Sequence, residues 1–397
     1  MSADVALVNA TVATMEGHGY GLLEGASIGI LDGIIDSVGP GRPQAADIVD
    51  LGGRLVTPGL IDAHTHLVFG GNRAREFELR LGGATYAELN ESGGGIRSTV
   101  RATRAASTDD LVGDATRRLG WLVGNGATTV EVKTGYGLDV ATELRMLEAI
   151  DRLRGGPADI HATLLAAHTV PHEYADDRAG YVQLVVEELI PSSVGLAQSV
   201  DVFVETIGFT AQEADQVLAA GVAAGLRASV HADQLTLGDG CHLAARYGAR
   251  SADHLEHADA AAVEVLASSG TVPVLIPGAS SFLDEPARPP VDLLRDHGLP
   301  IAVATDLNPG TSPTASLPLA MHLSCVRFGL TPLEALHGTT TAAAAALGLS
   351  DRGRVQEGQR ADLAVWDVTH PSELSYWVGA PLCTTTFVAG AMTKELA

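Results

Sequence analysis

Residues 58–66 read Pro-Gly-Leu-Ile-Asp-Ala-His-Thr-His, an apolar run that ends in two histidines. Side chains two residues apart on an extended segment point to the same face, so His64 and His66 can both reach one metal ion. In a parallel β-barrel, the chemistry lies where the strands end, at the carboxyl rim. The stretch therefore predicts the first strand of a barrel and the first two ligands of a metal site.

The middle of the chain alternates β-branched runs with amphipathic stretches such as residues 139–154, 211–224 and 259–269, the pattern of βα units around a parallel sheet. We count eight strands, and seven of them end at a residue that can bind metal or move a proton. These residues are His64 with His66, Lys133, His168, Glu205, His231, His254 and Asp306. One such histidine alone is more often structural, but seven strand ends together predict an α/β fold with a (β/α)₈ TIM-like barrel and an active site at its rim.

Both ends of the chain carry short strands separated by Gly and Asp, for example residues 5–8, 34–38 and 361–366. Neither end has enough apolar residues for a core of its own. We therefore predict that residues 1–55 and 353–397 together build a small β-sandwich domain. It would flank a catalytic barrel of residues 56–352.

Composition narrows the class of partner. The 397 residues include 48 acidic and 25 basic side chains, a formal net charge of −23, which disfavours nucleic acid and anionic lipid as partners. Three scattered cysteines predict neither a disulfide framework nor a cysteine zinc site. No basic leader or long apolar run is visible. We expect a cytoplasmic protein that acts on a small molecule.

Two further strand-end residues complete a metal site. His231 on the fifth strand offers a third imidazole, and Asp306 on the eighth offers a carboxylate. Three imidazoles and one carboxylate suit Zn²⁺ or iron (Fe²⁺ or Fe³⁺) better than Mg²⁺ or Ca²⁺, and the ligand types do not decide between zinc and iron.

These features resemble the amidohydrolase superfamily, and over nearly the whole length the chain is similar to its imidazolonepropionase family. The most specific matches are Lys133-Thr-Gly-Tyr-Gly137 and Asp306-Leu-Asn-Pro-Gly-Thr311. The resemblance implies a hydrolase acting on a cyclic amide, which converts 4-imidazolone-5-propanoate to N-formimidoyl-L-glutamate in histidine degradation. It also implies a homodimer and one ion per chain. Glu205 stands where binuclear relatives carry a bridging lysine, which agrees with a single ion.

The resemblance also assigns catalytic roles. Asp306 would accept a proton from water and pass it to the leaving ring nitrogen. His254 would position or deprotonate the water, or stabilise the oxyanion, unless it is ion-paired with Asp253 or Glu256. Gln234 would face the N–C–N edge of the ring, and its amide puts in doubt any scheme that needs a carboxylate base there, as some relatives have.

The substrate's carboxylate needs a cation in so acidic a protein. By resemblance Arg73 supplies it, since a guanidinium can hold a carboxylate with two hydrogen bonds. The alternative is an arginine paired with Glu76. The other substrate-binding residues that the resemblance implies are Tyr136, His168, Gln234, Asn308, Gly310 and Thr311. The run Gly93–Ile96 is expected to form a loop over the pocket.

Two other functions stay open. A deaminase or cyclic amidohydrolase for another small heterocycle would use the same ligands, but it would not need Arg73 or the loop of residues 133–136. An inactive barrel that serves as a binding protein should have lost a ligand, and all four are present.

Overall fold

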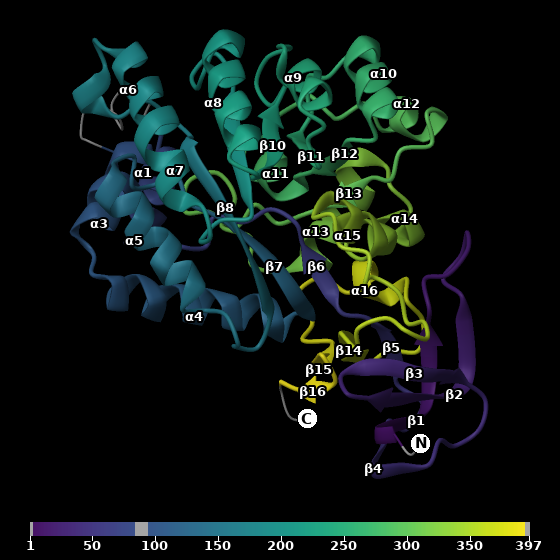
Figure 1. Ribbon diagram of the computed structural model, residues 1–397. Coiled ribbons are helices and arrows are strands. Elements are labelled where there is room, and N and C mark those ends of the chain that lie inside the picture. Colours follow the sequence, from purple (N-terminus) through teal and green to yellow (C-terminus); the bar gives the residue numbers. More distant parts are fainter. Residues whose placement is uncertain (1–2, 84–93, 394–397) are drawn as a thin grey trace.

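The computed structural model describes residues 3–83 and 94–393, and its larger part is a barrel of parallel strands (Figure 1). Eight strands form one sheet in which each pairs in parallel with the next along the chain. They are β6 (Leu60–Asp62), β7 (Ala127–Lys133), β8 (Asp159–Ala167), β9 (Ser199–Val204), β10 (Arg227–Ala232), β11 (Ser251–His254), β12 (Val272–Leu275) and β13 (Ala302–Val303). The predicted (β/α)₈ barrel is confirmed.

The barrel closes just beyond the carboxyl ends of its first and last strands. The Asp306 N–H donates to the His64 carbonyl at 2.9 Å, and the His66 N–H donates to the Leu307 carbonyl at 3.0 Å. Below this seam, the Asp62 carboxylate accepts from the N–H and the O–H of Thr305, at 3.0 and 2.6 Å. Backbone bonding therefore joins the two segments that carry three of the four predicted ligands.

Helices connect the strands and cover the outside of the barrel (Figure 1). They are α1 (Ala74–Leu81), α3 (Ile96–Ala105), α4 (Thr108–Gly124), α5 (Val140–Asp151), α6 (Arg178–Leu184), α7 (Ile190–Ser193), α8 (Ala211–Ala223), α9 (Gly240–Arg246), α10 (Ala260–Ser269), α11 (Pro277–Leu283), α12 (Val291–Asp296), α13 (Leu317–Phe328), α14 (Pro332–Gly338), α15 (Thr341–Ala346) and α16 (Glu373–Tyr376). The three predicted helices are confirmed as α5, α8 and α10. Asp139 and Asp259 cap α5 and α10 by accepting backbone N–H bonds. Within the described ranges, no helix has both the length and the apolar character needed to cross a bilayer.

The two chain ends form a second sheet together, and both termini lie at this end of the molecule (Figure 1). Its strands are β1 (Ala3–Ala13), β2 (Leu22–Leu31), β3 (Ile34–Gly39), β4 (Ala45–Asp50), β5 (Leu55–Pro58), β14 (Leu363–Trp366), β15 (Cys383–Val388) and β16 (Ala391–Met392). Ile35 of β3 and Phe387 of β15, from opposite parts of the sheet order, share one apolar core. The sheet therefore curves around its core, and a small β-domain built from both termini is confirmed.

Trp366 docks this domain onto the barrel. Its indole is fully buried, it belongs to the barrel's apolar core, and its N–H donates to Thr57 Oγ1 at 2.9 Å. Gly126, with φ +91°, lies against the ring, where a Cβ would collide with the indole. The exact division at residues 55/56 and 352/353 stays a prediction. We propose a first boundary a few residues later, since β5 pairs with β1 and β14.

Arg352, whose side chain is buried, connects the two parts through a cluster of ion pairs. Its Nη1 lies 2.7 Å from Asp159 and 3.3 Å from Asp362, and its Nε lies 2.9 Å from Asp351. Arg352→Met removes this cation, although Arg360 Nε still pairs with the buried Asp362 at 2.9 Å, so we expect the free energy of unfolding to fall by about 1–3 kcal/mol. Urea unfolding measures this loss. The exposed neighbour Arg354 provides the control, because Arg354→Met should change the value by less than about 0.5 kcal/mol. Equal stability of the two variants would contradict the role of the cluster.

Candidate metal centre and binding cavity

The four predicted metal ligands converge at the barrel seam. His64 Nε2 lies 3.2 Å from His66 Nε2, and His66 Nε2 lies 3.4 Å from His231 Nε2. Asp306 Oδ1 lies 3.3 Å from His66 Nε2 and 3.5 Å from His64 Nε2. Ligand atoms around a tetrahedral zinc, at about 2.0–2.1 Å each, are separated by roughly 3.3–3.4 Å. These four separations between donor atoms match those around a tetrahedral ion.

The protonation of these histidines also fits a metal. Burial, followed by nearby Lys133 and His231, holds the pKa values of His64 and His66 well below the ordinary range. Both rings are therefore neutral and can bind metal through nitrogen lone pairs. For His231, burial lowers the pKa, but the Asp201 carboxylate outweighs it and the net shift is upward.

Carboxylates behind the rings set their orientation. His64 Nδ1 lies 2.6 Å from Asp253 Oδ2, and His231 Nδ1 lies 3.0 Å from Asp201 Oδ2. A carboxylate at Nδ1 fixes the ring so that Nε2 faces the metal position. All these groups are buried.

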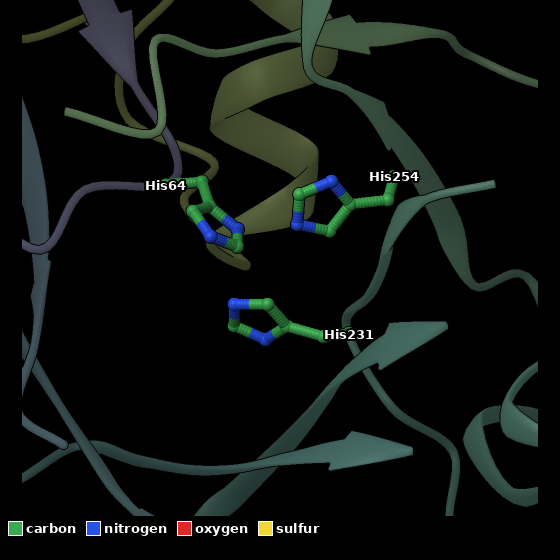
Figure 2. A group of neighbouring side chains, drawn as sticks. All are labelled: His64, His231 and His254. Carbon is green, nitrogen blue, oxygen red and sulfur yellow. The ribbon is translucent and has the colours of Figure 1, made fainter. Parts of the chain in front are cut away.

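His254 completes the group on the side of β11. Figure 2 shows the rings of His64, His231 and His254 turned toward one shared space, and the His254 ring centroid lies 5.3 Å from that of His231 and 5.6 Å from that of His64. Burial lowers the pKa of His254 to about 3, so the ring is neutral. Its backbone has φ +82°, a strained conformation of the kind found at functional sites. Asp253, the alternative partner considered above, faces His64 instead.

A cavity of about 450 Å³ opens above the cluster. Every residue that we predicted to bind substrate lines it, together with four residues of the metal and catalytic set. The lining residues from the prediction are Arg73, Tyr136, His168, Gln234, Asn308, Gly310 and Thr311, with His66, His231, His254 and Asp306. His168 donates through Nδ1 to the Gly135 carbonyl at 3.0 Å and stacks on the His66 ring.

Arg73 satisfies both interpretations of the sequence. Its Nε donates to Glu76 Oε2 at 3.1 Å, and its Nη2 pairs with Glu76 Oε1. Its third nitrogen, Nη1, approaches Gly310 at the cavity wall so closely that a Cβ there would collide with it. One edge of the guanidinium is thus held by Glu76, and the other is presented to the cavity.

The side-chain amide of Asn308 organises the loop that follows Asp306. Asn308 Oδ1 accepts from the N–H groups of Gly310 and Thr311, both at 2.8 Å, and Asn308 Nδ2 donates to the Asp306 carbonyl at 2.8 Å. The donors that we expected to face a ligand therefore shape the loop in this structure.

Several residues of the site were not predicted. Phe203, Ile207 and Leu283 form apolar walls of the cavity, and no polar signal in the sequence marks them. Glu205, a strand-end candidate, does not line the cavity. It accepts from the Leu235 and Thr236 N–H groups at 2.9 and 3.0 Å and so fixes the loop that carries Gln234. Of the predicted covering loop, Gly93 lies outside the described residues, whereas Gly95 and Ile96 line the cavity.

Comparison with known proteins supports this picture. The amidohydrolase family model matches residues 55–393. An imidazolonepropionase from Chromobacterium violaceum is 50% identical over 97% of this chain and 96% of its own length, and one from Hahella chejuensis is 48% identical over 94% and 95%. Among solved structures, an adenosine deaminase from Xanthomonas campestris with bound zinc superposes with a TM-score of 0.74 at 17% identity, covering 100% of this chain and 94% of that one. A triazine hydrolase variant gives 0.76 at 18% identity, covering 99% and 95%. These structural likenesses concern the fold.

Proposed function

Because the chain belongs to the amidohydrolase family and its curated relatives at about half identity are imidazolonepropionases, we propose that it hydrolyses 4-imidazolone-5-propanoate to N-formimidoyl-L-glutamate. This reaction is a step of histidine degradation. One observation carries the assignment beyond family membership: three of the four proposed ligands, His66, His231 and Asp306, line the same cavity as Arg73. A heterocycle with a carboxylate side chain can contact the proposed metal ligands through its ring and Arg73 through its carboxylate.

We propose that His64, His66, His231 and Asp306 hold one zinc or iron ion. When bound, the ion supplies Lewis acidity, which brings the pKa of water towards about 7 and polarises the ring carbonyl. The spacing of the four donor atoms and the neutral state of His64 and His66 support this assignment.

In the proposed mechanism, Asp306 accepts the proton of the attacking water and donates it to the ring nitrogen as the C–N bond breaks. Burial raises the pKa of Asp306, opposed in part by His254 and His231, which brings the carboxyl nearer to the range of a general base. Neutral His254 accepts a hydrogen bond from the water or steadies the oxyanion. Gln234, with one donor and one acceptor group, orients the N–C–N edge of the ring.

We propose that Arg73 Nη1 binds the propanoate, with Tyr136, His168 and the loop of Asn308, Gly310 and Thr311 around the ring and the product's new carboxylate. Arg73→Ala should raise KM about 10–100-fold, since it removes a charged hydrogen bond worth about 1.5–3 kcal/mol, and kcat should change little. Steady-state kinetics measure the effects on KM and on kcat separately. Arg75 on the same helix is exposed, and Arg75→Ala is the matched control. An unchanged KM for Arg73→Ala would remove this residue from recognition.

The alternative is a deaminase or cyclic amidohydrolase for another heterocycle, and the apolar walls of the cavity suit it equally. Turnover of freshly prepared 4-imidazolone-5-propanoate, followed by loss of its ultraviolet absorbance, tests the proposal. A panel of aminated heterocycles and cyclic amides that lack a carboxylate is assayed in parallel. Turnover of the panel without turnover of the imidazolone would establish the alternative.

We also propose a cytoplasmic homodimer, as the resemblance implies. The exposed run Tyr376, Trp377 and Val378 offers an apolar face for contact between copies. Light scattering after gel filtration tests the dimer, and cell fractionation tests the location.

A further inference from the structure

A buried charge cluster lies behind the candidate metal ligands, with Lys133, at the end of β7, in its centre. Its Nζ lies 2.8 Å from Asp201 Oδ2, 3.1 Å from Glu131 Oε1 and 3.6 Å from Asp253 Oδ2. The lysine side chain is 1% exposed, and the three carboxylates are buried as well. Burial of an ammonium group is costly unless such partners surround it.

Two of these carboxylates continue to metal ligands. Asp201 Oδ2 lies 3.0 Å from His231 Nδ1, and Asp201 Oδ1 accepts the His231 N–H at 3.2 Å. Asp253 Oδ2 lies 2.6 Å from His64 Nδ1. In each case, the oxygen that faces the imidazole is the one that faces Lys133.

The third carboxylate reaches the segment between His64 and His66. The Thr65 N–H donates to Glu131 Oε2 at 3.3 Å, and the Thr65 hydroxyl donates to the Glu131 carbonyl at 2.6 Å. The backbone N–H of Lys133 itself donates to the Thr65 carbonyl at 2.8 Å. Lys133 therefore connects to both ligand-bearing segments, His64–His66 and His231.

The composition of the chain singles out this lysine. Of the 25 basic residues, 23 are arginines, and the two lysines are Lys133 and Lys394. Lys133 is the only lysine among the described residues, so the other ion pairs in that part of the chain use arginine or histidine. The ammonium of lysine is a compact point charge that contacts the three carboxylates through one atom, whereas a guanidinium spreads its contacts over a planar fork.

We propose that Lys133 is the positioning residue of the metal centre, which holds Asp201 and Asp253 in place so that His231 and His64 present Nε2 to one ion. The inference rests on the proposed metal-dependent function. Without the ammonium, three buried carboxylates repel one another, and the two imidazoles lose the groups that fix their ring orientation.

The test is Co²⁺ binding by metal-free Lys133→Met, measured in competition with a chromophoric chelator and by visible absorption. We expect the Co²⁺ affinity to fall about 10–100-fold and the bands of tetrahedral Co²⁺ to weaken. Lys133→Arg should restore the affinity only in part. In turnover assays at saturating metal, kcat should fall more than KM rises.

Arg352→Met is the matched control, since Arg352 is also a buried cation with three carboxylates but lies at the junction of barrel and β-domain. It should lose stability yet keep the wild-type Co²⁺ affinity and spectrum. Wild-type affinity and spectrum in Lys133→Met would overturn the proposal. If Lys133→Met does not fold, Asp201→Asn and Asp253→Asn replace it: a weakened Co²⁺ site in both supports the proposal, and wild-type binding in both overturns it.

The proposed function can fail separately. Wild-type protein that binds Co²⁺ as described but does not hydrolyse the imidazolone would disprove the substrate and leave the role of Lys133 standing. Turnover of the imidazolone, with Co²⁺ binding unaffected in Lys133→Met, would support the substrate and overturn the role of Lys133.

Discussion

Asp306→Asn is expected to lower kcat by about 10³–10⁴-fold while the protein stays folded. General acid–base catalysis by a positioned carboxylate contributes about 10²–10⁴-fold, and here the same side chain is also a proposed metal ligand. Asp306 Oδ1 faces His64 and His66 at 3.5 and 3.3 Å, so Oδ2 is the oxygen that can take the proton of the attacking water. An amide keeps the shape of the side chain and one ligand oxygen, but it cannot accept that proton.

The measurement combines pre-steady-state and steady-state kinetics with metal content and circular dichroism on the same preparation. Asp259→Asn is the control, because it makes the same chemical change at the cap of α10, where asparagine caps as well as aspartate. Near-normal kcat in Asp306→Asn with metal bound would remove Asp306 from proton transfer. His254 would then be the remaining candidate for the base.

The fold and the ligand set were predictable because both depend on periodic features of the sequence. Strand alternation placed His64 and His66 on one face, and the rule that parallel strands end at one rim brought in His231 and Asp306. In the structure, His66 Nε2 lies within 3.4 Å of a donor atom of each of the other three. Two predicted helical stretches begin at Asp139 and Asp259, and in the structure these residues cap α5 and α10.

What was not predictable depends on which way a strand-end side chain points. Lys133 and Glu205 are strand-end candidates of the same kind as His231, yet neither lines the cavity. Lys133 points among the buried carboxylates behind the ligands, and Glu205 binds backbone N–H groups of the next loop. A single residue of register decides such differences, and the sequence does not fix it at a strand end.

The contacts made by loop side chains were the second feature that the sequence did not predict. The sequence offered Arg73 either as a substrate clamp or as a partner of Glu76, and the structure shows that a guanidinium has nitrogens enough to pair with Glu76 and still reach the cavity. Asn308 lines the cavity as expected of a substrate contact, and the sequence did not show that its side-chain amide also accepts backbone N–H groups of its own turn.

Removal of the metal should abolish turnover, and either Zn²⁺ or Fe²⁺ should restore it. Four of the separations among the ring nitrogens of His64, His66 and His231 and one oxygen of Asp306 are 3.2–3.5 Å, and a cation bound between these atoms compensates the repulsion of their lone pairs. The pKa of free water is about 15.7, and a bound metal ion lowers it towards about 7. Without that shift, water at this site is too weak a nucleophile. We expect about one ion per chain by elemental analysis of protein as purified, and the element found decides between zinc and iron.

Stability should follow the metal as well. An ion that binds only the folded chain adds about 4 kcal/mol when its free concentration is about 1,000 times the Kd, so the thermal midpoint should rise on reconstitution. His66→Ala is the control, because it removes one ligand and should lose both the activity and the metal-dependent rise. Arg352→Met should start from a lower midpoint yet show the full rise, since its cluster lies away from the ligands. An equal rise in His66→Ala would mean that the ion stabilises the protein somewhere other than at this centre.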